Sequence, residues 1–180
     1  MISATLSRLL QEQFSESAVN AALVALGYQL ADRRETRTKN VRVTYKHAKQ
    51  LREFPSASLL VKALEIQVEL FAFTVLEPPP TDTPAYRRLL QKSAAAFKQE
   101  LLELTALLGP PSTLRRLGEV RVEGAEGADS FEFAVWQVGS KKLTLEHTQW
   151  DDTSPLAVEV VMSGVSELEL LPIEGRLPPA

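Results

Sequence analysis

The residues of this chain that could do chemistry are few and far apart. Its 180 residues include no cysteine and two histidines, His47 and His147. Neither histidine lies in a His-x-x-x-His or His-Glu-x-x-His spacing, so the sequence predicts no metal site. His147 precedes Asp151 and Asp152 in the stretch HTQWDD, which could assemble an acid–base site. The same pattern fits a packed core histidine followed by a turn, and we favour that interpretation.

Familiar enzyme motifs are missing from the sequence. It contains no glycine-rich phosphate loop, no Gly-x-Ser-x-Gly elbow and no Ser-x-x-Lys motif. A carboxylate pair brought together by the fold stays open as an alternative, because such pairs assemble in space. We therefore predict a non-enzymatic protein with no catalytic residue, no metal and no cofactor.

Positive charge is concentrated near the N-terminus. Residues 31–49, ADRRETRTKNVRVTYKHAK, hold seven Lys or Arg, although the formal net charge of the chain is −3. Residues 1–56 hold nine Lys or Arg against five Asp or Glu, whereas residues 57–180 hold eleven against eighteen. This asymmetry indicates two modules or one basic face. We predict a helical module with a basic hairpin over 1–56 and an α+β domain over 57–180.

The basic segment is expected to form a hairpin behind two short helices. Apolar residues at helical spacing predict the helices, with Ser15 as the N-cap of the second and Gly27 ending it. Strands are predicted over 28–34 and 41–46, where Val41, Val43 and Tyr45 alternate with charged or polar residues. The charged side of this basic ribbon should therefore face solvent.

The rest of the chain predicts an α+β fold in which a long helix packs on an antiparallel β-meander sheet. The helix runs over 84–108, capped by Thr83 and stopped by Gly-Pro-Pro. Residues 64–77 fit a strand or a helical face, and we favour the strand, preceded by a helical turn over 58–63. Further strands are predicted over five ranges: 119–123, 131–138, 142–149, 156–162 and 166–171.

Aromatic residues fall on both faces of the predicted sheet. Trp136 alternates with Phe131 and Phe133, so one helix cannot cover all of this bulk. The N-terminal module, a second subunit or a partner would cover the other face. A homodimer through a sheet face is thus one of the alternatives.

Residues 6–46 resemble a winged helix-turn-helix module. The resemblance lies in the turn at Phe14-Ser15, the helix end ALGY and the charged hairpin. It implies that the second helix lies in the major groove, with Asn20 as its base-edge reader, and that the hairpin arginines and lysines contact phosphates. The chain departs from the family in having no further helix before the pair and no Lys or Arg in the second helix.

The C-terminal part is similar in layout to small bacterial accessory proteins, including immunity proteins. The shared features are a long helix ending in LGPP and a tryptophan-bearing meander. The resemblance implies a protein that acts by occluding a partner.

The sequence favours a binding or accessory protein that acts through surface complementarity, with the basic ribbon steering an acidic protein or nucleic acid. The alternative is a DNA-binding protein that uses residues 6–46, with the C-terminal domain for dimerisation or regulation. The predicted binding residues are Arg33, Arg34, Arg37, Lys39, Arg42, Lys46 and Asn20. No long apolar run and no secretory pattern is visible, so we expect a soluble cytoplasmic protein without a membrane partner.

Overall fold

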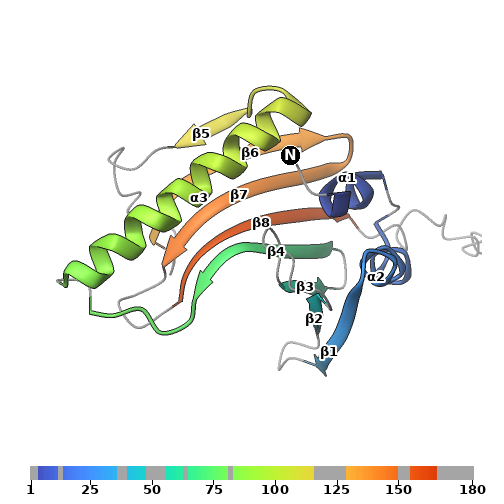
Figure 1. The fold of residues 1–180 in the computed structure, drawn as a ribbon. Coiled ribbons are helices and arrows are strands. Elements are labelled where there is room, and N and C mark those ends of the chain that lie inside the picture. The colour runs from blue at the N-terminus through green and yellow to red at the C-terminus, as the bar shows by residue number, and fades with distance from the viewer. Residues whose placement is uncertain are drawn as a thin grey trace, which may run out of the picture.

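The computed structural model describes residues 4–11, 14–35, 40–47, 56–62, 65–80, 83–115, 129–149 and 155–165. Its strands form one antiparallel sheet of eight strands in the order β1-β2-β3-β4-β8-β7-β6-β5. The strands are β1 (Tyr28–Glu35), β2 (Val41–His47), β3 (Ser56–Val61), β4 (Glu65–Val75), β5 (Thr113–Arg115), β6 (Asp129–Val138), β7 (Lys141–Gln149) and β8 (Leu156–Val165). The helices are α1 (Ala4–Gln11), α2 (Glu16–Ala25) and α3 (Pro84–Leu108). The predicted α+β class is confirmed, and Figure 1 shows α3 lying across the strands of the C-terminal half.

The N-terminal elements form as the local sequence predicts. Ser15 caps α2, because its Oγ accepts a hydrogen bond of 3.2 Å from the Ala18 amide. Gly27 follows the helix with a φ of 91°, a conformation that favours glycine. Strands β1 and β2 then pair in an antiparallel hairpin, and β2 continues the pairing with β3. The basic ribbon is therefore the edge of the large sheet.

Two predictions about strands are settled by the pairing. Residues 65–75 form the long strand β4, as favoured. The helical turn predicted over 58–63 is wrong, because Ser56–Val61 forms strand β3 between β2 and β4. A short apolar run fits either state, and pairing along both edges selects the strand. The short strand β5 was not predicted from the sequence. The strands predicted over 119–123 and 166–171 lie outside the described residues.

Helix α3 has the predicted bounds and caps. The Thr83 Oγ1 accepts a 3.2 Å hydrogen bond from the Tyr86 amide, Pro84 begins the helix, and Gly109 ends it with a φ of 81°. The buried side of α3 includes two polar residues that the apolar stripe did not predict, Ser93 and Glu100. Within the described residues, no helix is long and apolar enough to span a bilayer.

Alternation along the strands divides the sheet into a helix-covered face and a face opposite α3, which we call the uncovered face. On β7, Leu143, Leu145 and His147 point toward α3 and are fully buried. Their neighbours Thr144 and Glu146 must point the other way. All three described helices contact the covered face. Helix α3 packs on β7, the Lys141 Nζ donates hydrogen bonds to the carbonyls at the end of α1, and Asn20 of α2 accepts one from Tyr45 of β2.

The covered face leaves little room where the chain segment after α1 meets β8. A Cβ added to Gly164 would lie 2.8 Å from Cδ1 of Phe14, whose side chain is 3% exposed. We predict that Gly164→Ala lowers the free energy of unfolding by about 1–3 kcal/mol in urea denaturation, because the aromatic ring must shift. Ser163→Ala, on the uncovered face, is the control and should change the value by less than about 0.5 kcal/mol. If Phe14→Leu does not reduce the cost of Gly164→Ala, the contact does not cause it.

Candidate functional site

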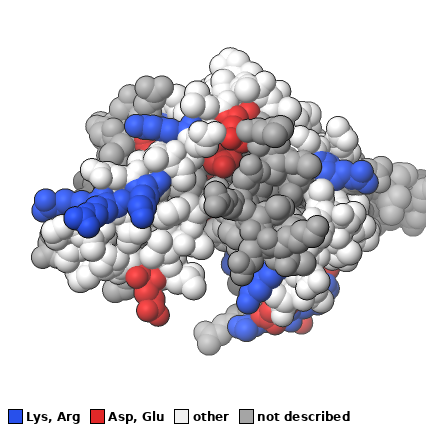
Figure 2. All heavy atoms as spheres, viewed as in Figure 1, with Lys and Arg blue, Asp and Glu red and all other residues white. Residues whose placement is uncertain are grey.

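The three described arginines of the basic ribbon have carboxylate partners. Arg33 pairs with Glu16 of α2 at 2.5 Å, Arg34 pairs with Asp32, and Arg42 pairs with Glu69 of β4 at 3.6 Å. Figure 2 accordingly shows acidic atoms among the basic ones over β1 and β2. The pairs of Arg33 and Arg34 are exposed and contribute little stability, whereas the Glu69 side chain of the third pair is 11% exposed. All three pairs reduce the positive potential that the sequence suggested.

The predicted binding residues are divided between the two faces of the sheet. Arg34, Arg42 and Lys46 lie on the uncovered face, whereas Arg33 lies on the covered face beside α2. The Oδ1 of Asn20 accepts a 2.8 Å hydrogen bond from the Tyr45 hydroxyl. The remaining two predicted residues, Arg37 and Lys39, lie outside the described residues.

A second group of cations lies on the exposed side of α3. Figure 2 shows a row of basic atoms over this helix. None of these side chains forms an ion pair within the described part of the chain: Arg87, Arg88, Lys92 and Lys98. Sequence reasoning considered only the apolar stripe of this helix and so missed its basic side.

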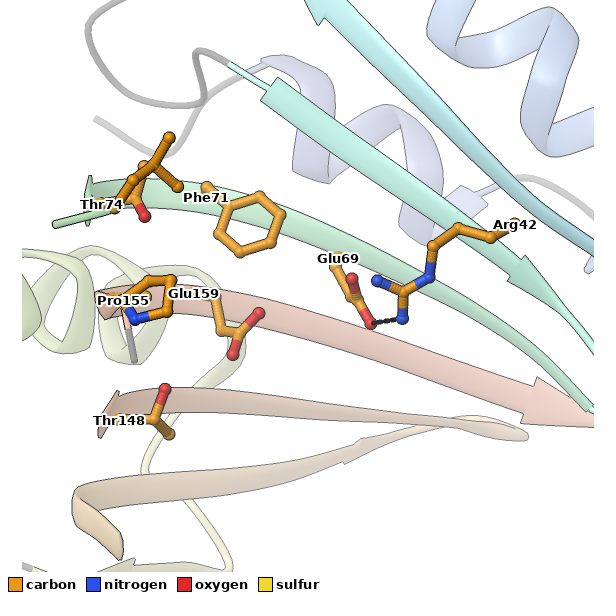
Figure 3. Close-up of a pocket in the computed structure, with 9 residues that line it drawn as sticks. Arg42, Glu69, Phe71, Thr74, Thr148, Pro155 and Glu159 are labelled. Atoms are coloured by element: carbon orange, nitrogen blue, oxygen red, sulfur yellow. Dashed lines mark ion pairs between the residues drawn. The ribbon is translucent and has the colours of Figure 1, made fainter. Parts of the chain in front are cut away.

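The uncovered face carries a pocket of about 380 Å³ along β4 and β8 (Figure 3). Its apolar walls are Phe71, Leu76, Pro155 and Ala157. Its polar lining consists of Arg42, Glu69, Thr74, Thr148 and Glu159. Of the binding residues predicted from the sequence, the pocket includes Arg42 alone.

Three carboxylates meet on the uncovered face because β4, β8 and β7 are adjacent. Glu159 of β8 lies directly opposite Glu146 of β7, and Glu69 lies across from Val161, two residues further along β8. Glu69 accepts one hydrogen bond from Gln67 and pairs with Arg42. Within the described residues, neither Glu146 nor Glu159 has a hydrogen bond or an ion pair. Like charges directly opposite in an antiparallel pair are unfavourable.

The surroundings of Glu159 and Glu146 favour the protonated forms of these two side chains. Burial raises the pKa of Glu159 to about 7, with further contributions from the charges of Glu69 and Glu146 and opposition from Arg42. Burial also raises the pKa of Glu146, where Lys142 opposes the shift and Glu69 adds to it. Glu159 therefore changes its protonation state near neutral pH.

One hydroxyl beside this cluster lacks a partner. Ser58 of β3 lies directly opposite Glu69, and its side chain is 5% exposed. Its Oγ is the buried side-chain oxygen without a hydrogen bond in the described part of the chain.

A second polar group lies beneath α3. The Nε2 of His147 lies 2.8 Å from Oγ of Ser93, and its Nδ1 lies 3.4 Å from Oε2 of Glu132. The order serine, histidine, carboxylate is that of a hydrolase triad. Ser93 and His147 are both 0% exposed, however, and the Ser93 hydroxyl donates to the Leu90 carbonyl. Substrate cannot reach this serine, so the group is a structural network.

The histidine in this network is the packed core residue that strand alternation favoured. Burial lowers the pKa of His147, while its bond to Glu132 and the charge of that carboxylate oppose the shift. Asp151 and Asp152, the other members of the hypothetical acid–base site, lie outside the described residues.

Neither the arrangement of possible metal ligands nor comparison with known proteins assigns a function to this chain. Among the residues that the structure describes, no three His, Cys, Asp or Glu side chains are grouped to hold a metal ion. No protein family, curated protein or solved structure matches this chain. The pocket on the uncovered face is therefore the candidate functional site.

The raised pKa of Glu159 predicts a pH-dependent effect of Glu159→Gln. The folded-state pKa is about 7 against an ordinary value of 4.5, so the stability from the protonated group is present below pH 4.5 and is lost as the pH rises through 7. At pH 8 the variant should be more stable than the native chain by about 1–3 kcal/mol in urea denaturation. At pH 5 most of the difference should disappear. The control is Glu77→Gln at an exposed position, and equal stability of Glu159→Gln and the native chain at both pH values would contradict the account.

The buried network predicts a cost for Ser93→Ala. Removing the hydroxyl deletes the buried 2.8 Å hydrogen bond between Oγ of Ser93 and Nε2 of His147, which should lower the free energy of unfolding by about 1–3 kcal/mol. Chemical denaturation measures this loss, with Gln91→Ala on the exposed side of α3 as the matched control. A neutral Ser93→Ala would show that the hydrogen bond contributes nothing to stability.

Proposed function

We propose that this chain is a non-enzymatic binding protein that holds its partner by surface complementarity on the uncovered face of the sheet. The observation that carries this proposal is the pocket of about 380 Å³ lined by four apolar and five polar side chains. Ligand sites in proteins are concave, mostly apolar and roughly 300–1,000 Å³ in volume, with a few convergent polar groups. The volume of this pocket falls within that range, and its lining combines an apolar wall with polar groups.

The position of Arg42 connects this proposal with the basic ribbon. Arg42 belongs to the ribbon strand β2 and also lines the pocket, where it pairs with Glu69. A partner seated in the pocket would therefore contact the ribbon. Steering of an acidic partner by the ribbon stays a prediction, as does DNA binding through residues 6–46.

Binding is better supported than catalysis because of where the reactive groups lie. The nucleophile and base that the fold brings together, Ser93 and His147, are enclosed beneath α3. In the pocket, Glu159 has a pKa suited to proton transfer. A binding experiment should therefore also measure whether the compounds tested as ligands are chemically converted.

The proposal is tested by NMR titration of the ¹⁵N-labelled full chain with a panel of aromatic and aliphatic fragments carrying cationic, neutral or anionic groups. We expect dissociation constants on the order of 1 mM, with shifts concentrated at the pocket residues of β4 and β8. The same spectra report any conversion of a fragment, which would indicate an enzyme. Size-exclusion chromatography in the same buffer identifies a second copy of the chain as an alternative occupant of this face.

A matched pair of variants localises the binding. Thr74→Trp places an indole at the pocket and should abolish the fragment shifts, because Thr74 is exposed and lines the pocket. Thr113→Trp makes the same change on the exposed edge strand β5, away from the pocket, and should leave binding unchanged. Equal effects of the two variants, or fragment shifts scattered over the whole chain, would contradict a ligand site at this pocket.

A further inference from the structure

The charge of the pocket is unbalanced toward the negative. Its two carboxylates, Glu69 and Glu159, share one cation, and that cation pairs with Glu69. Within the described residues, Glu159 has no hydrogen bond or ion pair of its own. Removing a carboxylate from water without giving it a hydrogen-bond partner costs free energy. A ligand of opposite charge bound to Glu159 would recover this free energy.

The strand next to β8 adds a second reason for a cation. Glu146 of β7 lies directly opposite Glu159, and the two carboxylates repel when both are ionised. The charged groups that face Glu159 are Glu69 from β4, Arg42 from β2 and Glu146 from β7, so the acidic groups outnumber the basic one. A positive charge placed at Glu159 would be attracted by all three carboxylates.

The walls of the pocket determine what else the ligand carries. Phe71, Leu76, Pro155 and Ala157 present apolar surface beside Glu159, and Figure 3 shows Phe71 projecting from the strand adjacent to that of Glu159. An apolar group of the ligand would be removed from water against these walls. The face of the Phe71 ring can also attract a cation. Apolar walls offer no donor atoms to a metal ion, and among the described residues no group of three His, Cys, Asp or Glu side chains could hold one.

We propose that the pocket binds an organic cation, a protonated amine attached to an apolar group, with its ammonium group paired to Glu159. This inference rests on the proposed binding function of the pocket and adds the chemical class of the ligand. The ammonium group donates hydrogen bonds to the carboxylate, and the apolar group lies against Phe71 and Pro155.

The experiment compares three probes of similar size and different charge. Phenethylamine is cationic, 2-phenylethanol is neutral and 3-phenylpropionate is anionic at pH 8. Each is titrated into the ¹⁵N-labelled full chain. The expected result is that phenethylamine shifts the pocket resonances and binds at least about tenfold more tightly than the alcohol, since a buried charge-assisted hydrogen bond is added.

The other outcomes separate the two proposals. If the alcohol or the carboxylate binds at the pocket as tightly as the amine, the pocket is a ligand site but the inference about its cation is overturned. If none of the three probes shifts the pocket resonances, and the fragment panel also fails to do so, the proposed function itself is overturned.

Substitution of the carboxylate and a change of pH provide two further readouts. Glu159→Gln should weaken phenethylamine binding at least about tenfold and leave the affinity for 2-phenylethanol unchanged, while exposed Glu77→Gln is the control. Since the pKa of Glu159 is about 7, lowering the pH from 8 to 6 protonates most of this carboxyl. The affinity of the native chain for the amine should then fall about tenfold, and that of Glu159→Gln should stay constant. The assignment to Glu159 would be contradicted if Glu159→Gln bound phenethylamine as tightly as the native chain at pH 8. It would also be contradicted if the affinity of the native chain did not depend on pH.

Discussion

Burial of one face of an antiparallel sheet beneath α3 is the constraint on which the rest of this molecule depends. Because side chains alternate along a strand, burying Leu143, Leu145 and His147 under the helix directs Glu146 to the opposite face. Pairing of β7 with β8 then places Glu159 across from Glu146, and pairing of β8 with β4 brings Glu69 to the same region. The acidic pocket is thus a consequence of how the core is packed, and a shift of one residue in either register would disperse it.

The two polar groups of the protein differ in what surrounds them. Beneath α3, Ser93, His147 and Glu132 are buried and bonded to one another, so their polar atoms are satisfied within the fold. On the uncovered face, Glu159 has no hydrogen bond or ion pair among the described residues, and burial together with the charges of Glu69 and Glu146 raises its pKa. A group that costs stability in the free protein is most readily explained by a partner that binds it. This contrast is why the pocket, and not the histidine, is the candidate site.

Much of the fold could be predicted from the sequence because its signals are local. The cap at Thr83, the apolar stripe of α3, the stop at Gly109 and the alternation in β2 each depend on neighbouring residues. The candidate site could not be predicted, because Glu69, Glu146 and Glu159 meet only through the strand order β4-β8-β7. The predicted meander does make β7 and β8 neighbours, but the pairing of β4 with β8 joins segments far apart in the chain, and a single sequence carries no signal for it. The ion pairs of the ribbon were missed for the same reason, since Glu16 and Glu69 reach Arg33 and Arg42 from other elements.

The central claim is that the Glu159 carboxylate binds the cationic group of a ligand. Carbon-detected NMR titration of the glutamate side chains tests it most directly. With ¹³C-labelled protein, the carboxyl resonance of Glu159 is followed against pH in the absence and in the presence of phenethylamine. The account predicts a pKa near 7 in the free protein and a lower pKa when the amine is bound, because a nearby positive charge favours the ionised form. A pKa near the ordinary glutamate value of 4.5 that does not respond to the amine would contradict it.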